Sequence, residues 1–323
     1  MNILITGAAG FIGYNLCLNL LNDKKKKYII YGIDNFDDYY SKKIKKSRIS
    51  ELKKFKNFIF YKIDITDKKK IINFFKNKYF KIAFHFAAQA GVRYSIVNPQ
   101  KYIDVNIKGF VNILNCMISS KTEKIFYASS SSVYGDTKKF PSNEKDTLNP
   151  KNIYAMTKVF NENYAEQFSK DYKIKLIGLR FFTVYGEFSR PDMLIGKLIG
   201  NINKKKKFNI NNKGNHVRDF TYIKDACLII NKLMQKKITK NHDIFNICSN
   251  NPINITNVIN KIIINYGKTK ISYVKINKLD VLKTHGDNSK ILKLVGNINF
   301  TNINKGVLNT ISWFKNKKIT KNY

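Results

Sequence analysis

The most informative segment of the 323-residue sequence is Ile3-Leu4-Ile5-Thr6-Gly7-Ala8-Ala9-Gly10-Phe11-Ile12-Gly13. Its first four residues are apolar or β-branched and predict a short buried strand, and glycines then follow at three-residue intervals. Leu16, Leu20 and Leu21 recur at helical spacing after them, so the glycines lie in a turn between a strand and a helix. This arrangement is typical of a dinucleotide-binding unit, in which the amides at the helix start face a pyrophosphate.

Each glycine of this turn has its own expected role. Gly7 permits the tight turn, Gly10 lets the backbone approach a pyrophosphate, and Gly13 lets helix and strand pack closely. A second apolar run ends at Asp34, 21 positions after Gly13, where a carboxylate accepts the ribose hydroxyls of NAD and repels the 2′-phosphate of NADP. We therefore predict an NAD site, with Asp64 at the end of the third strand close to the adenine. A doubly wound fold without a cofactor is the alternative.

Strands and helices alternate along the first half of the chain. Further strands are expected at 57–62, 81–86, 124–128 and 175–180, and helices near 41–55, 67–78, 99–118 and 151–171. Such alternation predicts a parallel sheet with helices on both faces. Beyond residue 181 the alternation loosens. We predict an α/β fold, a Rossmann-like doubly wound parallel sheet with a smaller mixed α/β C-terminal substrate lobe. The expected domains are 1–180, joined by part of 219–247, and 181–323.

The charge balance would suggest a nucleic-acid partner, because 59 Lys and Arg residues against 22 Asp and Glu residues give a net charge of +37. The lysines, however, are scattered through the whole chain among many Asn and Ile residues, as an A/T-rich coding sequence would produce. We therefore expect no nucleic-acid partner. Arginines are few, so each one draws attention: Arg48, Arg93, Arg180, Arg190 and Arg218.

Composition excludes several other classes of protein. The content of 43% hydrophobic residues is too high for a disordered chain. No run reaches the ~18 consecutive apolar residues of a membrane span, so no membrane partner is expected. The four histidines are dispersed and predict no metal site. The cysteines have no paired spacing and predict a reducing, cytoplasmic setting: Cys17, Cys116, Cys227 and Cys248.

A serine-rich strand end and a tyrosine–lysine pair predict the chemistry. The fifth strand ends in Tyr127-Ala128-Ser129-Ser130-Ser131-Ser132, where doubly wound sheets bind ligands. Tyr154 and Lys158 are four residues apart, so they share one helical face. A phenol has a pKa of about 10, and we expect the ammonium group and a positive nicotinamide ring to lower it. Tyr154 is thus the expected base, with a serine hydroxyl relaying the substrate's proton.

Together these motifs resemble the extended short-chain dehydrogenase/reductase superfamily and, within it, the UDP-glucuronate 4-epimerases. The resemblance covers most of the chain and is densest from residue 1 to 225. Its superfamily motifs imply NAD chemistry, and the blocks 89–95 and 182–193 imply an acidic UDP-sugar. The blocks that carry it are Asp34–Tyr40, Ala87–Ser95, Leu179–Gly186, Arg190–Met193 and Arg218–Tyr222.

The resemblance also implies roles for individual residues at the cofactor. Tyr154 becomes the catalytic base, Lys158 its partner and a ligand of the nicotinamide ribose, and Ser130 the catalytic hydroxyl. The other positions that the family uses to line the cofactor are Phe11, Ile12, Ala87, Ala88, Asn106 and Phe182. We add Asn35, Ile65 and Gln89, which directly follow Asp34, Asp64 and Ala88 in the sequence.

For the substrate, the resemblance implies that Thr183 and Arg190 hold the sugar carboxylate and that Arg218 contacts the uridine diphosphate. A planar guanidinium suits a carboxylate or phosphate better than lysine does. Glu187 departs from the family pattern, and its charge would oppose a sugar carboxylate unless the side chain faces away. The remaining expected substrate contacts are Ser130, Ser131, Lys283 and Arg93. Lys283 belongs to a tail segment that has no arginine. For Arg93 a structural role is equally open.

The implied activity is NAD-dependent 4-epimerisation of UDP-glucuronate to UDP-galacturonate through a 4-keto intermediate, for polysaccharide precursor synthesis. The related dehydratases and decarboxylases carry acids where this chain has Ser131 and Ser132. Two alternatives stay open: a 4-epimerase of another UDP-sugar, such as UDP-N-acetylglucosamine, and a non-catalytic NAD-binding protein. The resemblance further implies a homodimer through the helices near 99–118 and 151–171.

Overall fold

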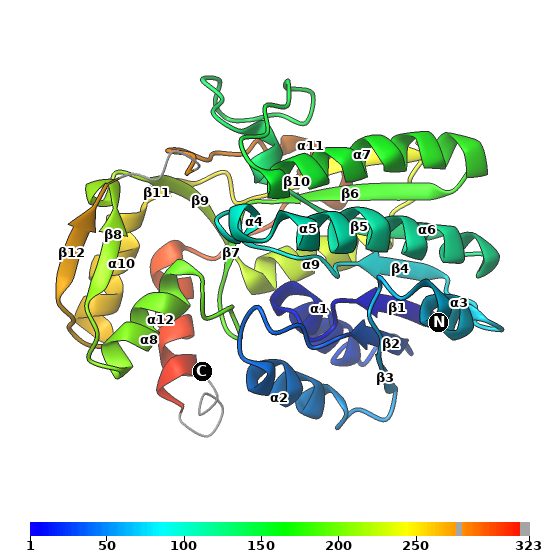
Figure 1. Ribbon diagram of the computed structural model, residues 1–323, viewed down its shortest axis with the longest axis horizontal. Coiled ribbons are helices and arrows are strands. Elements are labelled where there is room, and N and C mark those ends of the chain that lie inside the picture. Colours follow the sequence, from blue (N-terminus) through cyan, green and yellow to red (C-terminus); the bar gives the residue numbers. More distant parts are fainter. Residues whose placement is uncertain (276–279, 317–323) are drawn as a thin grey trace.

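The computed structural model describes residues 1–275 and 280–316, so residues 276–279 and 317–323 of the predicted second lobe lie outside the described residues. Its centre is a seven-stranded parallel sheet in the order β10-β6-β5-β4-β1-β2-β3 (Figure 1). This confirms the predicted fold class. The strands are β1 (Asn2–Thr6), β2 (Ile29–Asp34), β3 (Phe58–Lys62), β4 (Ile82–His85), β5 (Lys124–Ser130), β6 (Lys175–Phe181) and β10 (His242–Ile247).

Each face of the sheet carries its own apolar core, because successive side chains of a strand point to opposite faces. In β1, Ile3 and Ile5 pack into one core, whereas Leu4 packs into the other. The first core includes α1 (Phe11–Leu21), α2 (Lys42–Leu52) and α9 (Ile223–Met234). The second includes α3 (Lys68–Phe75), α6 (Gly109–Ser119) and α7 (Ile153–Tyr172).

The single helix expected near 99–118 is interrupted. The segment consists of α5 (Pro99–Tyr102), a π-helical turn η1 (Ile103–Lys108) and α6, and it follows the short α4 (Tyr94–Val97). Its irregular turn is anchored from both sides: the carbonyl of Asn106 accepts a hydrogen bond from Asn161, and its side chain bonds the backbone of Gln89. Such π-turns are frequent at functional sites.

The second lobe lies on the left of Figure 1 and contains two small sheets. Its apolar residues belong to the same core as the first face of the large sheet, so the two lobes share one core. The assignment of functions to lobes of residues 1–180 and 181–323 stays a prediction. The remaining strands and α-helices of the described residues are β7 (Thr183–Tyr185), α8 (Leu194–Asn203), β8 (Phe208–Asn211), β9 (Val217–Tyr222), β11 (Pro252–Asn254), α10 (Ile255–Asn265), β12 (Ile271–Val274), α11 (Ser289–Val295) and α12 (Ile303–Lys315).

Across the described ranges, none of the helices combines the length and the apolar character that a membrane crossing requires. The carboxyl ends of the strands in the large sheet lie at one edge, and a cavity lies at that edge. Ligands of doubly wound sheets bind at the carboxyl ends of the strands.

Candidate functional site

The glycine turn between β1 and α1 forms one wall of the cavity. Gly7 has a φ of +73°, and a Cβ there would lie 2.7 Å from the amide nitrogen of Ala87. A Cβ on Gly13 would lie 2.2 Å from the carbonyl oxygen of Gly7. Helix α1 begins at Phe11 after Gly10, and no side chain caps its first turn. Its first amides therefore face the cavity side without a capping group, which fits a bound pyrophosphate.

Asp34 ends β2 beside this turn and is nearly buried. One carboxylate oxygen accepts the amide of Ala9 at 3.0 Å and the other accepts the amide of Phe36 at 2.8 Å. Burial raises the pKa of Asp34, and the cations Lys45 and Arg48 oppose that rise. The two amides fix the carboxylate in the cavity wall, as a ribose-binding acid requires.

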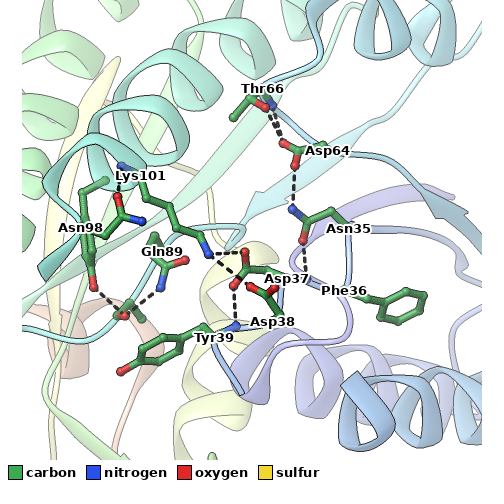
Figure 2. A network of polar contacts seen from close by, with 12 residues as sticks. Asn35, Phe36, Asp37, Asp38, Tyr39, Asp64, Thr66, Gln89, Asn98 and Lys101 are labelled. Carbon is green, nitrogen blue, oxygen red and sulfur yellow. Dashed lines mark hydrogen bonds and ion pairs between the residues drawn. The ribbon is translucent and has the colours of Figure 1, made fainter. Parts of the chain in front are cut away.

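Asp64 lies behind the cavity wall instead of lining it. Its carboxylate accepts the side chain of Asn35 at 2.8 Å and both the amide and the hydroxyl of Thr66 (Figure 2). Burial would raise the pKa of Asp64, but the hydrogen bonds from Thr66 and Asn35 outweigh it and lower the pKa. Asp64 thus holds Asn35 in the wall, and Ile65 lines the cavity beside it.

Arg48 is the main site-supporting residue that the motifs did not reveal, although its rarity as an arginine was a signal. It is fully buried, and it donates to the carbonyl of Ala9 at 2.7 Å and to the hydroxyl of Tyr40 at 2.8 Å. It also donates to the carbonyls of Phe188, at 2.7 Å, and Ser189. Arg48 therefore joins the glycine turn to the segment that precedes Arg190.

The expected catalytic residues converge at the other end of the cavity. Ser130, Tyr154 and Lys158 all line it, on the end of β5 and the first turns of α7. Lys158 Nζ donates to the carbonyl of Ala128 at 2.8 Å and lies 5.9 Å from the centre of the Tyr154 ring. The hydroxyl of Ser130 accepts the amide of Ser132 at 3.1 Å.

The residues of the protein itself do not lower the pKa of Tyr154 below its ordinary value; the expected contribution of a nicotinamide ring stays a prediction. Burial raises the pKa of Tyr154, although hydrogen bonding to Ser130 and the charge of Arg190 act in the opposite direction. Lys158 was expected to lower this pKa; instead, burial lowers the pKa of Lys158 itself to about 8. The two buried groups thus both disfavour charge, because desolvation outweighs their neighbours.

A buried ion pair supports the catalytic helix. Arg180 donates to both carboxylate oxygens of Glu162, at 2.9 and 2.7 Å, and both side chains are almost inaccessible. Ser129 donates to the same carboxylate at 2.5 Å. Because Glu162 is one turn after Lys158 on α7, this pair ties the catalytic helix to β5 and β6.

Arg190 lines the cavity near Tyr154, where its guanidinium already binds an acid of this chain. It donates to both carboxylate oxygens of Asp192, at 3.0 and 2.5 Å. Asp192 also accepts the hydroxyl of Tyr39 at 3.1 Å. Burial would raise the pKa of Asp192, but Arg190 outweighs it and lowers the pKa, so the acid stays ionised.

The other expected substrate cations gather around the segment after residue 279. Arg93 pairs with Asp280 at 2.6 Å, and Arg218 donates to the carbonyl of Leu282 at 3.0 Å. Lys283 lies 4.4 Å from the centre of the Phe140 ring. These three cations are therefore close to one another in the fold, on segments that are far apart in the sequence.

Glu187 faces away from the cavity, so its charge does not oppose a sugar carboxylate there. Its carboxylate accepts the hydroxyl of Tyr222 at 2.7 Å and lies 3.1 Å from the ammonium of Lys224. The following Phe188 adopts a φ of +58° and packs on Tyr14, with ring centres 4.6 Å apart. The unusual segment 187–189 thus docks on the first lobe.

One cavity unites most of the expected site. From the predicted cofactor set, its wall contains Gly7, Gly10, Phe11, Ile12, Gly13, Asp34, Asn35, Ile65, Ala87, Ala88, Gln89, Tyr154, Lys158 and Phe182. From the predicted substrate set it contains Ser130 and Arg190. Expected residues that the structure places outside this wall are Asp64, Asn106, Arg93, Ser131, Thr183, Arg218 and Lys283.

The fold and this cavity define a Rossmann-type enzyme of the extended short-chain dehydrogenase/reductase kind. Residues 3–248 match the NAD dependent epimerase/dehydratase family, and the chain belongs to that family. A UDP-glucuronate 4-epimerase of Thermodesulfobacterium geofontis is 37% identical over 97% of this chain and 95% of its own length.

Solved structures agree with this assignment. The structure of a UDP-glucuronic acid 4-epimerase from Bacillus cereus, in complex with UDP-glucuronic acid and NAD, has a TM-score of 0.90 and 30% identity, covering 98% of this chain and 99% of that one. A UDP-glucose 4-epimerase from Thermotoga maritima, in complex with UDP-glucose, has a TM-score of 0.88 and 26% identity, covering 98% of this chain and 100% of that one.

Proposed function

We propose that this protein converts UDP-glucuronate to UDP-galacturonate by NAD-dependent inversion at C4. The observation that carries the proposal is a single cavity whose wall joins the glycine turn and Asp34 to Ser130, Tyr154 and Arg190. The similarity to UDP-glucuronate 4-epimerases over nearly the whole chain supports it. A role in polysaccharide precursor synthesis is part of the proposal, because both sugars are glycan building blocks.

In this proposal the protein's residues hold the sugar and move one proton. Ser130 binds the 4-hydroxyl, and the Tyr154 oxygen removes its proton as the C4–hydrogen bond breaks. Tyr154 must be a phenolate for this step, and since burial raises its pKa, the positive charges of Lys158 and of a bound nicotinamide ring would have to favour that form. A bound NAD would supply the acceptor for the hydride from C4 and the donor for its return to the opposite face of the 4-keto sugar. Tyr154 then gives the proton back to the new hydroxyl, so substrate and product have the same oxidation state.

Lys158 and Arg190 have supporting roles in this scheme. Lys158 donates to the carbonyl of Ala128 and, with a pKa of about 8, presents a mostly protonated ammonium beside the phenol near neutral pH. Arg190 has the planar geometry to donate two hydrogen bonds to a sugar carboxylate. Asp192 occupies that same guanidinium edge, so an acidic sugar would exchange with an internal acid.

A second candidate substrate class is a neutral UDP-sugar, such as UDP-N-acetylglucosamine. The ion pair of Arg190 with Asp192 favours this alternative, because it leaves the arginine neutralised before any sugar binds. A UDP-glucose 4-epimerase is also among the similar structures.

The test is to incubate the purified protein with UDP-glucuronate and no added NAD, and to separate the UDP-sugars by chromatography. UDP-galacturonate is the expected product. Conversion of UDP-N-acetylglucosamine alone would select the second candidate, and release of carbon dioxide would indicate decarboxylation. Inertness toward every UDP-sugar would overturn the proposal.

We also propose that the protein is a cytoplasmic homodimer. The four buried free cysteines suit a reducing compartment. Met156 and Phe160 lie one turn apart on α7 and expose apolar surface, as does Ile103 on the adjoining η1. Two copies of this face would bury it, and sedimentation of the wild type against Phe160→Glu tests the proposal: a monomeric wild type contradicts it.

A further inference from the structure

We propose that Lys101 and Asp37 form a strap across the cofactor crevice that slows the release of NAD. The strap is an ion pair between Lys101 Nζ and one carboxylate oxygen of Asp37 at 2.7 Å. It deepens the proposed function, because the inversion at C4 requires the same cofactor molecule for both hydride transfers. Neither residue lies in a glycine, serine or tyrosine–lysine motif.

Asp37 belongs to a loop after β2 that side chains hold in a fixed shape (Figure 2). The Asn35 side-chain oxygen accepts the amide of Asp37 at 2.8 Å, and Asp37 accepts the amide of Tyr39 at 2.9 Å through its other carboxylate oxygen. Lys45 donates to the carbonyl of Asp37 at 2.7 Å. Asp37 itself lines the cavity, so its carboxylate is fixed at the crevice.

Lys101 reaches this carboxylate from the opposite side. It stands on α5, where Asn98 accepts its amide at 3.2 Å. Figure 2 shows its side chain extended toward Asp37 and Asp38, and Nζ lies 3.6 Å from the Asp38 carboxylate. The side chains of Lys101 and Asp37 are only 20% and 24% exposed. Burial alone would lower the pKa of Lys101, but the hydrogen bond and charge of Asp37, with the charges of Tyr94 and Asp38, together raise it, so the cation stays charged.

The sheet topology places this ion pair across the crevice. Asp37 follows β2 and Lys101 follows β4, and β1 lies between those two strands. A contact between the segments that leave β2 and β4 therefore spans the end of β1, where the glycine turn begins. A dinucleotide bound against the glycine turn would lie beneath the ion pair. Its escape would require the pair to open.

The ion pair is joined to the rest of the crevice on the α5 side. Tyr102, the residue after Lys101, donates to the carbonyls of Ala90 at 2.9 Å and Gly91 at 2.5 Å. Ala90 lines the cavity. Tyr102 thus ties α5, which carries Lys101, to the loop after β4 in the cavity wall.

Two charge-neutralising variants separate a strap from simple attraction between Lys101 and a pyrophosphate. Lys101→Gln removes the cation, and Asp37→Asn removes the anion but keeps an oxygen for the Tyr39 amide. The strap predicts that each variant releases NAD roughly fivefold faster, and that the double variant is no faster than either single one. Direct attraction predicts that Lys101→Gln releases NAD faster and that Asp37→Asn releases it more slowly.

The measurement is the dissociation of NAD from the full-length protein, loaded with NAD, freed of excess by gel filtration and followed without any sugar. Lys108→Gln is the matched control, since Lys108 is exposed on the adjacent η1, and it is expected to release NAD like the wild type. Lys101→Arg keeps the charge and should restore slow release. Urea unfolding of the NAD-free forms measures the free energy of unfolding of each variant and so shows whether a variant is generally destabilised. Lys101→Arg would not selectively reverse a general destabilisation.

Unchanged release in Lys101→Gln, or slower release in Asp37→Asn, would overturn the strap. Because the measurement involves no sugar, its result is independent of the proposed substrate. A protein that retains NAD but does not epimerise UDP-glucuronate would contradict the proposed function while leaving the strap intact.

Discussion

The two ends of the cavity hold their charged groups in different ways. At the glycine turn, Asp34 is fixed by two backbone amides, and Arg48 is fully buried among carbonyl and hydroxyl oxygens. At the substrate end, Arg190 is paired with Asp192, and Arg93, outside the cavity wall, is paired with Asp280 and has a side chain that is 51% exposed. Backbone bonds resist exchange, whereas ion pairs of side chains can exchange one carboxylate for another.

This contrast suits a cofactor that stays and a substrate that leaves. A group held by buried hydrogen bonds is preorganised and does not reorganise when its ligand binds. The Arg190–Asp192 pair is partly exposed and, unlike the Lys101–Asp37 pair, meets an acidic ligand, so an incoming sugar carboxylate can replace Asp192 at small cost. Changes at the glycine-turn end should therefore affect stability and cofactor content. Changes at the other end should affect substrate affinity.

The largest expected effect is on turnover. Tyr154→Phe removes the oxygen that moves the proton, so turnover of UDP-glucuronate should fall by about 10³-fold while bound NAD is retained. Tyr164→Phe, on the same helix α7, is the matched control and should turn over like the wild type. Activity of Tyr154→Phe close to that of the wild type would remove the base from the scheme.

Arg190→Ala should weaken the binding of an acidic sugar selectively. The loss of a charge-assisted pair predicts a dissociation constant for UDP-glucuronate that is roughly 10- to 100-fold higher, with little change for UDP-glucose. Arg218→Ala is the companion variant, since a diphosphate contact is common to both ligands and both should weaken together. Calorimetric titration measures the four dissociation constants, those of the two variants for each of the two UDP-sugars. Equal losses in Arg190→Ala would contradict the carboxylate assignment.

The glycine-turn end should also be the acid-sensitive one, through His85. Burial lowers the pKa of His85 to about 3, with Lys158 adding to the effect, and its ring bonds the hydroxyl of Thr6 at 2.7 Å. The unfolded chain binds this proton near its ordinary pKa of about 6.5, but the folded chain does not. Stability from His85 is therefore complete above about pH 6.5 and declines as the pH falls toward 3.

Between pH 7 and pH 5 the free energy of unfolding should fall by about 2 kcal/mol on account of His85. Urea unfolding at both values measures it, and His85→Gln should show a flatter pH dependence whatever its absolute stability. His285→Gln is the control, because that ring is much less buried. An equally steep dependence in His85→Gln would mean that other groups carry the acid sensitivity.

The sequence predicted the glycine-turn end far better than the substrate end, and the reason is local geometry. Gly7, Gly13 and Asp34 act through backbone conformation and short-range contacts, which leave a spacing in the sequence. The parallel sheet followed from alternating strands and helices for the same reason. By contrast, the Arg93–Asp280 pair joins side chains that are 187 residues apart, and no periodicity encodes that contact.

Two features escaped prediction for physical reasons. The raised pKa of Tyr154 results from burial, which depends on packing around the site and not on the spacing of Tyr154 and Lys158. The role of Arg48 depends on carbonyl oxygens as far along the chain as Ser189. Only its rarity among so many lysines pointed to it.

The smallest effect expected is also the sharpest test of exchangeable pairing. Asp192→Asn removes the internal acid on Arg190 but keeps one oxygen for the hydroxyl of Tyr39. If Asp192 competes with the sugar carboxylate, the dissociation constant for UDP-glucuronate should fall by roughly three- to tenfold, and that for UDP-glucose should not change. Glu166→Gln, which removes one negative charge from an exposed pair with Lys170, controls for net charge. Weaker binding of UDP-glucuronate in Asp192→Asn would mean that Asp192 positions Arg190 instead of occupying it, and the two ends of the cavity would then be equally preorganised.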